Sequence, residues 1–282
     1  RPSRYPDIGT RAGWSLAVCF GSSPESIPFF TGILIFTMQR FFITPNAIHD
    51  DLVQFPEAIA RQMEKVLRLD LMNDEVIVLD NSGNSYLVRL NGRQAGILHG
   101  VILQITETNP RTGLKLELGF SLTKREKVEW ILQKATELGV SVFRPFVSER
   151  SLDRGLTLGN ARRERWTAII REAAEQSHRA KLPELHDPVA FRDALDCFTL
   201  DSLRLFAWEG VSPEIQIKPD WFKNASGLSV LVGPEGGFSA EEARMAADAG
   251  FRHFSLGRRI LRMETACLSV CALGAHYLER AD

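Results

Sequence analysis

The sequence predicts an α/β protein with a parallel sheet, preceded by a smaller strand-rich domain. Short apolar runs alternate with helix-period patterns through residues 109–282, as in a sheet covered by helices on both faces. Residues 38–108 instead carry several β-rich runs around one helical pattern. Two apolar runs, 228–232 and 251–256, each end at a glycine turn. Glycine turns at the ends of neighbouring strands form a crevice of the kind in which α/β proteins bind ligands.

Composition narrows the class of protein. The chain of 282 residues has a formal net charge of −1, so any nucleic-acid surface must be a local patch. Its four cysteines contain no C-x-x-C pair, which argues against disulfides and a zinc site and favours a reducing compartment. The six histidines show no metal-ligand spacing, so we predict no metal. Cys267 and Cys271, four residues apart in the last predicted helix, are expected to be buried as small hydrophobic side chains.

The first 37 residues differ from the rest of the chain. They are rich in Arg, Ser, Pro and Gly, and the apolar run at 27–36 is too short to span a bilayer, so no membrane segment is predicted. Their composition suits a transit peptide, which would direct the protein to an organelle. We favour the alternative that Met38 is the true start and that residues 1–37 are an unstructured extension from a mis-called start.

The β-rich runs of residues 38–108 fall at 75–79, 86–90 and 101–105. The segment at 80–84, Asp-Asn-Ser-Gly-Asn, is typical of a hairpin turn. A helix is expected at 58–69, where apolar residues recur on one face. Short strands around one helix indicate a small barrel.

The middle of the chain reads as a βαβ unit. A strand at 114–122 is followed by Thr123 and Glu126, which have the capping-box spacing of a helix start. That helix runs to Leu138, and the next strand is at 140–147. The elements expected after it are a helix at 162–177 and a strand at 203–208.

The first glycine turn, residues 233–237, is followed by Ser239 and Glu242, again at capping-box spacing. No Gly-Lys-Ser/Thr follows the glycines, so the turn is not a P-loop. It is not a G-x-G-x-x-G dinucleotide turn, and Glu235 would repel a pyrophosphate. The second glycine of a nucleophile elbow is also missing.

The second glycine turn lies at Gly257, and Thr265 is the expected N-cap of the last helix. Glycines permit positive φ and let a ligand approach bare backbone. Two interpretations remain: a crevice for a ligand that backbone groups recognise, or two ordinary βα turns with glycine for tight packing.

Two blocks of the sequence, GPEGGFS at 233–239 and SLGRRILRMETA at 255–266, carry a resemblance to a known family. In order and spacing they are similar to the carboxy-terminal signature of the 16S rRNA uridine-N3 methyltransferases. That family belongs to the SPOUT superfamily of S-adenosylmethionine-dependent, trefoil-knotted methyltransferases. The resemblance covers nearly everything after Met38 and includes EAAEQSHR at 172–179. It departs at Met263, where the family usually has Thr.

The resemblance implies a SPOUT-type α/β knot in residues 109–282 that binds S-adenosylmethionine among its knotted loops. The cofactor-binding residues carried over from the family are Leu231, Gly233, Pro234, Gly236, Leu256, Gly257, Leu261 and Arg262. For the chemistry, Glu264 is a candidate base for the N3 proton, and Arg262 is a candidate to stabilise negative charge on the flanking carbonyl groups. The alternative is that Arg262 and Glu264 pair across the turn and are structural.

The resemblance also implies RNA as the partner, namely 16S rRNA within the small ribosomal subunit. Residues 38–108 then form a PUA-like, RNA-binding barrel, although Gln62-Met63 stands where the family commonly has a His-leucine pair. The basic positions expected to contact RNA are Arg40, Arg68, Lys124, Arg150 and Arg179. Solvated surface charges paired with glutamates are the alternative for these positions.

The family is a cytoplasmic homodimer that joins across the knotted region. One local feature agrees, because the last helix carries small residues suited to close packing. They are Ala266, Ser269, Ala272, Gly274 and Ala275. A helix buried within one subunit would have the same composition.

Three rival functions remain at this point. One is an RNA-binding protein without catalysis, which the intact glycine-turn blocks disfavour. Another is a SPOUT methyltransferase that acts on a different RNA, such as a transfer RNA ribose. The last is a different nucleotide-binding α/β enzyme, which the lack of any phosphate loop disfavours.

Overall fold

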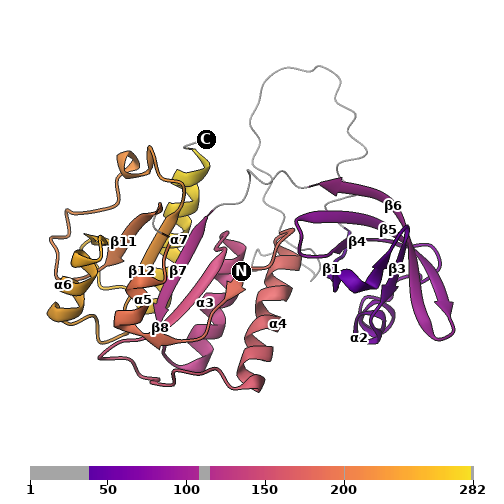
Figure 1. Ribbon diagram of the computed structural model, residues 1–282, viewed down its shortest axis with the longest axis horizontal. Helices are drawn as coiled ribbons and strands as arrows, with labels where there is room; N and C mark the ends of the chain where they lie inside the picture. Colours follow the sequence, from indigo (N-terminus) through magenta and orange to yellow (C-terminus); the bar gives the residue numbers. More distant parts are fainter. Residues whose placement is uncertain (1–37, 108–114, 200, 281–282) are drawn as a thin grey trace, which may run out of the picture. The chain divides into compact units, whose positions relative to one another are not determined.

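The computed structural model describes residues 38–107, 115–199 and 201–280 (Figure 1). The chain divides into two units, Arg1–Thr37 and Met38–Asp282. The expectation for residues 1–37 lies outside the described residues, and so does the predicted domain boundary between 108 and 109.

The amino-terminal part of the second unit is a curled six-stranded sheet with a single 3-10 turn and one short helical segment (Figure 1). Its elements are β1 (Arg40–Phe42), η1 (Pro45–Ala47), β2 (Ile48–His49), β3 (Leu52–Phe55), α2 (Glu57–Arg61), η2 (Gln62–Val66), β4 (Glu75–Leu79), β5 (Asn84–Gln94) and β6 (Ile97–Glu107). The strand order is β1-β4-β5-β6-β3-β2, with β1 and β4 parallel and the other pairs antiparallel. Among the strands that the structure describes, no ladder joins β1 to β2, so hydrogen bonding does not close this sheet into a barrel.

The turn between β4 and β5 confirms the predicted hairpin. Asn81 and Gly83 have positive φ of 66° and 110°, and the N–H of Ser82 donates to Oδ1 of Asp80 at 2.9 Å. The hairpin of β5 and β6 is longer than the two predicted runs. It turns at Ala95 and Gly96, both with positive φ, and an alanine in this conformation gives no turn signal in a sequence.

The carboxy-terminal part is built on a parallel sheet. Its elements are β7 (Leu116–Ser121), α3 (Arg125–Glu137), β8 (Val142–Val147), α4 (Asn160–Gln176), β9 (Glu184–Leu185), β10 (Val189–Ala190), α5 (Phe191–Asp196), β11 (Leu203–Ala207), η4 (Pro219–Phe222), β12 (Leu228–Val232), α6 (Ala240–Asp248), β13 (Arg252–Phe254) and α7 (Met263–Glu279). The strand order is β10-β8-β7-β12-β11-β13, with β9 paired to β8, and every pair is parallel. The predicted α/β class with a parallel sheet is confirmed.

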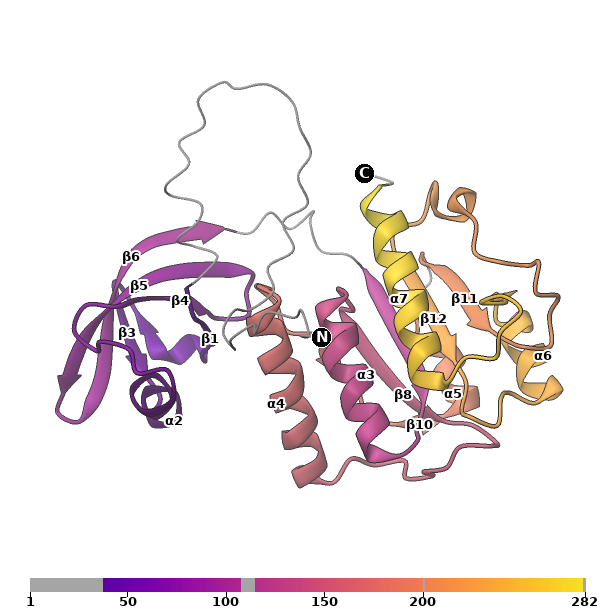
Figure 2. The ribbon, with the colours of Figure 1, turned by 180° about the vertical axis from the view of Figure 1, so that it is seen from behind.

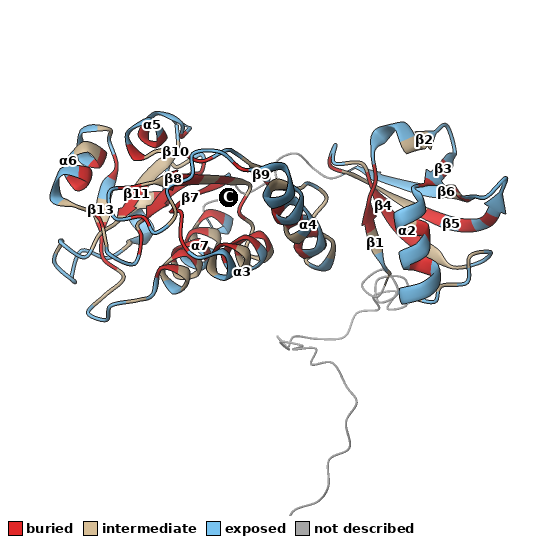
Figure 3. Ribbon diagram, turned by 90° about the horizontal axis from the view of Figure 1, so that it is seen from below, coloured by how far each residue is buried: buried red, intermediate tan, exposed pale blue. Residues whose placement is uncertain are grey.

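Helices cover both faces of this sheet. Figures 2 and 3 show α3, α4 and α7 on one face and α5 with α6 on the other. The first face buries Phe120, Ile131 and Cys267 in one apolar cluster. The opposite face buries Phe206 and Phe238 in another.

Strand β12 is buried along its whole length and is apolar except at Ser229, which is why it reads as a continuous run in the sequence. Strand β7 is equally buried but includes Glu117 and Ser121.

The chain crosses its own sheet between β13 and α7. β13 pairs with β11 at the sheet edge, whereas α7 packs on β12 and β7 in the interior. The long connection between β11 and β12 contacts the residue after β13 and the carboxy-terminal part of α7. The N–H of Ser255 donates to the carbonyl oxygen of Ile215 at 2.7 Å, and the Phe222 ring lies 5.1 Å from the ring of Tyr277 in α7.

Two of the three predicted helix caps are wrong. The capping box of Ser239 and Glu242 is present at the start of α6. The N-cap of α3 is Lys124 rather than Thr123, whose hydroxyl donates to a distant carboxylate instead. The N-cap of α7 is Arg262, so the predicted cap Thr265 lies inside the helix, where its carbonyl oxygen accepts from the Ser269 hydroxyl.

Candidate functional site

The two glycine turns lie at the same edge of the parallel sheet. β12 ends at Val232 and β13 ends at Phe254, and these strands flank β11 on its two sides. Neighbouring strands are about 4.8 Å apart, so the two strand ends are separated by about 10 Å. The predicted crevice between the turns therefore has a geometric basis.

The first turn is a tight reversal of the backbone. The N–H of Gly237 donates to the carbonyl oxygen of Pro234 at 2.9 Å, and Gly237 has φ of +68°. A side chain is strained at such φ, so glycine is required here. Gly233 is pressed against Phe238, since a Cβ at Gly233 would lie 2.8 Å from that ring.

The second turn is held by a buried hydroxyl. Gly257 has φ of +105°, and its N–H donates to Oγ of Ser255 at 3.1 Å. In return the Ser255 hydroxyl donates to the carbonyl oxygen of Gly257 at 3.2 Å. The predicted cofactor residues Leu256 and Leu261, on either side of Gly257, are both partly exposed.

Arg150 supports the first turn from the loop after β8. Its Nη1 donates to the carbonyl oxygen of Gly236 at 2.9 Å. A Cβ at Gly236 would lie 3.3 Å from the Cβ of Arg150, which is tighter than ordinary packing. The two residues are therefore in direct contact. Arg150 is exposed, and its guanidinium also makes a hydrogen bond to the first turn.

A charged cluster joins both turn motifs to α3. Nζ of Lys127 lies 2.9 Å from Oε1 of Glu235 in the first turn and 3.2 Å from Oε2 of Glu264 in the first helical turn of α7. The Thr123 hydroxyl donates to the same Glu235 oxygen at 2.5 Å. Oε2 of Glu264 is buried and makes no hydrogen bond of good geometry in the described structure, so we treat its contact with Lys127 as an ion pair. We name these four residues the Lys127 cluster.

The contact between Lys127 and Glu235 favours the charged form of both residues. The hydrogen bond with Glu235 is the main reason that the pKa of Lys127 lies above its ordinary value. Burial alone would raise the pKa of Glu235, but hydrogen bonds from Thr123 and Lys127 outweigh it and hold that pKa below its ordinary value. Two carboxylates and one ammonium leave the cluster with a formal net charge of −1.

The two predicted catalytic residues do not pair with each other in the described structure. Arg262 is exposed at the N-cap of α7, and its carbonyl oxygen accepts from the N–H of Ala266 at 2.9 Å. Glu264 is directed to Lys127 instead. The predicted alternative, an ion pair between Arg262 and Glu264 across the turn, is therefore absent from the described residues.

Leu231 occupies a different setting from the other predicted cofactor residues. Its side chain is fully buried in the apolar cluster with Phe206 and Phe238. Its backbone lies within the sheet, opposite Phe206 on one side and Gly119 on the other. Leu231 therefore shapes the strand beneath the first turn, whereas Gly233, Pro234 and Gly236 belong to the turn itself.

The predicted RNA-contacting residues fall into two kinds. Arg68 and Lys124 are exposed, as a phosphate contact requires. Arg179 is largely enclosed, and its Nη1 donates to the carbonyl oxygens of Thr136 and Val140 at 2.9 and 2.6 Å. Burial lowers the pKa of Arg179 to about 10. It therefore satisfies carbonyl groups at the end of α3, a structural role that the sequence did not indicate.

Arg40 also lies in a partly buried setting. Burial lowers its pKa, and its Nε is buried with no hydrogen-bond partner within the described ranges. His178 has φ of 61°, and its pKa is lowered by burial and, to a smaller extent, by the charge of Arg40. Arg40 and His178 are thus near each other where β1 meets α4.

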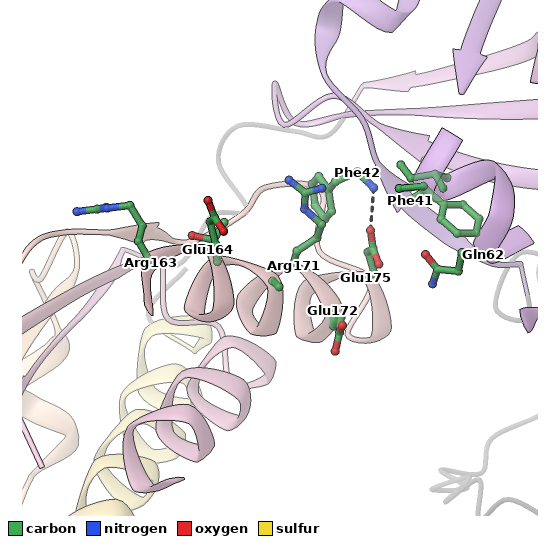
Figure 4. Close-up of a pocket in the computed structure, with 12 residues that line it drawn as sticks. Phe41, Phe42, Gln62, Arg163, Glu164, Arg171, Glu172 and Glu175 are labelled. Atoms are coloured by element: carbon green, nitrogen blue, oxygen red, sulfur yellow. Dashed lines mark hydrogen bonds between the residues drawn. The ribbon is translucent and has the colours of Figure 1, made fainter. Parts of the chain in front are cut away.

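A pocket of about 570 Å³ lies among β1, α2 and α4. Figure 4 shows its lining, with Phe41 and Phe42 on one side and the charged side chains of α4 on the other. The N–H of Phe42 donates to Oε1 of Glu175 at 2.9 Å. No residue of either glycine turn lines this pocket, so we do not assign the ligand of the glycine turns to it.

Two features are absent from the described residues, a metal-binding cluster and a membrane-spanning helix. Within those ranges, no group of three or more His, Cys, Asp or Glu side chains is arranged to hold a metal ion. In the same ranges no helix is long and apolar enough to cross a membrane.

Cys267 and Cys271 are fully buried, and burial raises the pKa of both thiols, as expected of small core side chains.

Sequence reasoning missed Lys127 and the role of Thr123. Lys127 lies in the predicted helix after β7, where a lysine on the polar face is ordinary. Its partner Glu235 is 108 residues away in the sequence, so no local spacing pattern indicates the contact. The only available signal was that both carboxylates stand inside the two motif blocks.

The comparisons with known proteins agree with this arrangement. The RNA methyltransferase domain family matches residues 110–275, which is more than half of the chain. A ribosomal RNA small subunit methyltransferase E from Bacillus subtilis is 29% identical over 239 residues, covering 82% of this chain and 93% of that protein. The protein of the same name from Synechocystis is 31% identical over 231 residues, covering 80% of this chain and 74% of that protein.

A solved structure is similar over most of its length. It is a ribosomal RNA small subunit methyltransferase E from Neisseria gonorrhoeae bound to S-adenosyl methionine, with a TM-score of 0.73 and 31% identity. The match covers 84% of this chain and 96% of that one. The fold, the positions of the glycine turns and these matches lead to one conclusion: the chain belongs to the RNA methyltransferase family that includes the ribosomal RNA small subunit methyltransferases E.

Proposed function

We propose that this protein transfers a methyl group from S-adenosylmethionine to N3 of a uridine in small-subunit ribosomal RNA. Family membership supports RNA methyl transfer, and the names of the relatives support the small subunit as the source of the RNA. The neighbour with bound S-adenosyl methionine supports the methyl donor. The observation that carries the proposal is the meeting of two glycine turns and a negative cluster at one sheet edge.

The residues at this edge fit a cationic methyl donor. Glycines at both turns leave the backbone without side chains, so a ligand can approach it closely. The carboxylates of Glu235 and Glu264 supply negative charge beside the turns, which is compatible with a positively charged sulfonium. The turns contain no phosphate loop, so they suit the proposed donor better than a nucleotide.

The chemistry needs positioning and charge stabilisation from this chain. When bound, S-adenosylmethionine supplies an electrophilic methyl group on a sulfonium. The turns must hold the uridine N3 in line with the carbon–sulfur bond, and such alignment provides much of the rate enhancement. That bond breaks with its electrons on sulfur as the nitrogen–carbon bond forms, and the N3 proton passes to a base.

We assign different roles to the two candidate catalytic residues. Arg262 is exposed beside the second turn, where its guanidinium can stabilise negative charge on the uridine carbonyl groups. Glu264 is held by the Lys127 ammonium at 3.2 Å, so its carboxylate is engaged with the protein. We therefore propose that Arg262 contacts the substrate and that Glu264 holds the turn in place.

We propose that the amino-terminal sheet is a PUA-like module that binds the RNA. Arg68 is exposed on it, and Lys124 and Arg150 are exposed at the carboxyl edge of the large sheet. Phosphate contacts from such residues position an RNA without reading its sequence.

We also propose that the crossing between β13 and α7 is the trefoil knot of the SPOUT class. The chain returns from the sheet edge to its interior while in contact with the connection between β11 and β12. A passage of the chain under this connection accounts for both contacts. Such threading is rare among folds.

A homodimer is the expected assembly. Gly274 is not available to a partner, because a Cβ there would meet the Leu228 side chain of the same chain. Other apolar side chains are exposed on the crossing and on the two helices that pack together after it: Ile260, which is 98% exposed, Leu273 in α7 and Trp130 in the adjacent α3. Exposed apolar side chains in this number support a subunit interface here.

The decisive experiment identifies the methylated nucleoside. The protein is incubated with labelled S-adenosylmethionine and unmodified small ribosomal subunits, and the RNA is digested to nucleosides. Label in 3-methyluridine supports the proposal. Label in a 2′-O-methylated ribose would assign the protein to another RNA methyltransferase reaction, and no label with intact RNA binding would favour a non-catalytic role.

A further inference from the structure

Lys127 belongs to neither glycine-turn motif, yet it contacts both. It lies in the first half of α3, while Glu235 is in the turn after β12 and Glu264 is in the first helical turn of α7. The side chain of Lys127 is 26% exposed, and those of Glu235 and Glu264 are 28% and 15% exposed. The ammonium therefore bridges two carboxylates in a partly enclosed setting, where ion pairs are screened less than at an open surface.

The arrangement is sensitive to the loss of one charge. Without the ammonium, two carboxylates that now lie within 3.2 Å of the same atom would repel each other. Glu235 would keep its hydrogen bonds from the Thr123 hydroxyl and from its own backbone N–H, and Glu264 would lose its one polar contact in the described chain at Oε2. Relief of that repulsion requires the first turn and the start of α7 to move apart.

Movement at these two places affects the proposed cofactor site directly. Glu235 lies between Pro234 and Gly236 in the first turn, and Glu264 follows Arg262 by two residues. The Lys127 cluster thus fixes the distance between the two backbone segments that would enclose the donor. A displacement of about 1 Å at a reacting centre can lower a rate about a hundredfold.

We infer that Lys127 is a positioning residue that locks the first glycine turn to the start of α7 and thereby sets the affinity for the methyl donor. This inference rests on the proposed donor site but not on the identity of the methylated atom. Lys127 acts through Glu235 and Glu264.

The test measures donor affinity in matched variants of the full chain. Lys127→Met removes the ammonium with little change in volume, and Lys127→Arg keeps the charge. Lys134→Met is the control. Lys134 is on the same helix, and its ammonium lies 2.7 Å from Glu137 rather than against a residue of either turn. Binding of S-adenosylmethionine and S-adenosylhomocysteine is measured by calorimetry, and folding by circular dichroism and thermal unfolding.

Lys127→Met is expected to weaken donor binding at least tenfold, which is about 1.4 kcal/mol. Lys127→Arg should recover most of the affinity, and Lys134→Met should bind as the wild type does. In activity assays Lys127→Met should raise the KM for the donor while the KM for the ribosomal subunit stays within about twofold. A role in stability alone would lower the melting temperature without this selective change in KM.

A charge-compensated variant separates repulsion from lost packing. Adding Glu264→Gln to Lys127→Met removes one of the two like charges, so donor binding should partly recover. Equal donor affinity in Lys127→Met and wild type would overturn the inference. If Lys127→Met does not fold, the single variant Glu264→Gln replaces it: it should bind the donor more weakly, and unchanged binding would overturn the inference. A wild type that binds no donor would instead refute the proposed function.

Discussion

Arg150 donates a hydrogen bond from Nη1 to the carbonyl oxygen of Gly236, 86 residues further along the chain and 2.9 Å away. The contact ties the loop after β8 to the glycine turn after β12, which are two strands apart in the sheet order. The turn at the proposed cofactor site is therefore held from two sides, by Arg150 and by the Lys127 cluster.

Gly236→Val is expected to abolish binding of S-adenosylmethionine while the fold remains. A Cβ at this position would lie 3.3 and 3.4 Å from side-chain atoms of Arg150, so a branched side chain must displace Arg150 or the turn. Calorimetry measures the binding, and circular dichroism checks the fold. Gly159→Val is the matched control, because a Cβ at Gly159 meets nothing within 4 Å. Wild-type affinity in Gly236→Val would contradict the proposed site.

Arg68→Ala and Arg150→Ala are expected to differ in which ligand they affect. Arg68 is exposed, so its loss should weaken RNA binding and reduce the salt dependence by about one phosphate contact. Arg150 also supports the first turn, so its loss should weaken binding of the methyl donor as well. Binding of RNA is measured across a salt series, and binding of the donor by calorimetry. Equal donor affinity in the two variants would show that Arg150 does not support the turn.

The sequence alone predicted those features that depend on residues close together in the chain. The capping box of Ser239 and Glu242 was predicted because its two hydrogen bonds join residues three apart. The parallel sheet was predicted because burial on both faces makes strands such as β12 apolar at nearly every position.

The features that were missed depend on distant partners. Thr123 has the spacing of a capping residue, but Glu235, 112 residues away, accepts its hydroxyl instead. Arg179 reads as a surface arginine next to His178, yet carbonyl groups of Thr136 and Val140 enclose it. Contacts between residues far apart in the sequence compete with local propensity. A single sequence does not show which of these contacts will form. The SPOUT class and the cofactor came from the resemblance alone.

Leu273→Glu is expected to convert the proposed dimer into a monomer. Leu273 is exposed in α7 near the crossing, and a buried carboxylate at a subunit interface would be strongly unfavourable. Sedimentation velocity measures the assembly. Leu152→Glu is the control, because Leu152 is an exposed leucine in a loop outside α7. A fully active wild-type monomer would refute the dimer.

Glu175→Gln is expected to stabilise the protein at neutral pH. The N–H of Phe42 donates to Oε1 of Glu175, which joins β1 to α4 (Figure 4). Burial is the main cause that raises the pKa of Glu175 above its ordinary value, while that hydrogen bond lowers it. The folded state therefore binds the proton more tightly than the unfolded chain, and this contribution is greatest below the unfolded pKa of about 4.5.

Stability should fall as the pH rises through the raised pKa, because the partly buried carboxylate then becomes charged. Glutamine keeps the acceptor for Phe42 without the charge, so Glu175→Gln should have a higher melting temperature than wild type at pH 7. The difference should disappear below about pH 4.5. Thermal unfolding from pH 4 to pH 8 measures it, with Glu164→Gln, an exposed position on the same helix, as the control. A lower melting temperature for Glu175→Gln at pH 7 would show that the charged carboxylate stabilises the contact between β1 and α4.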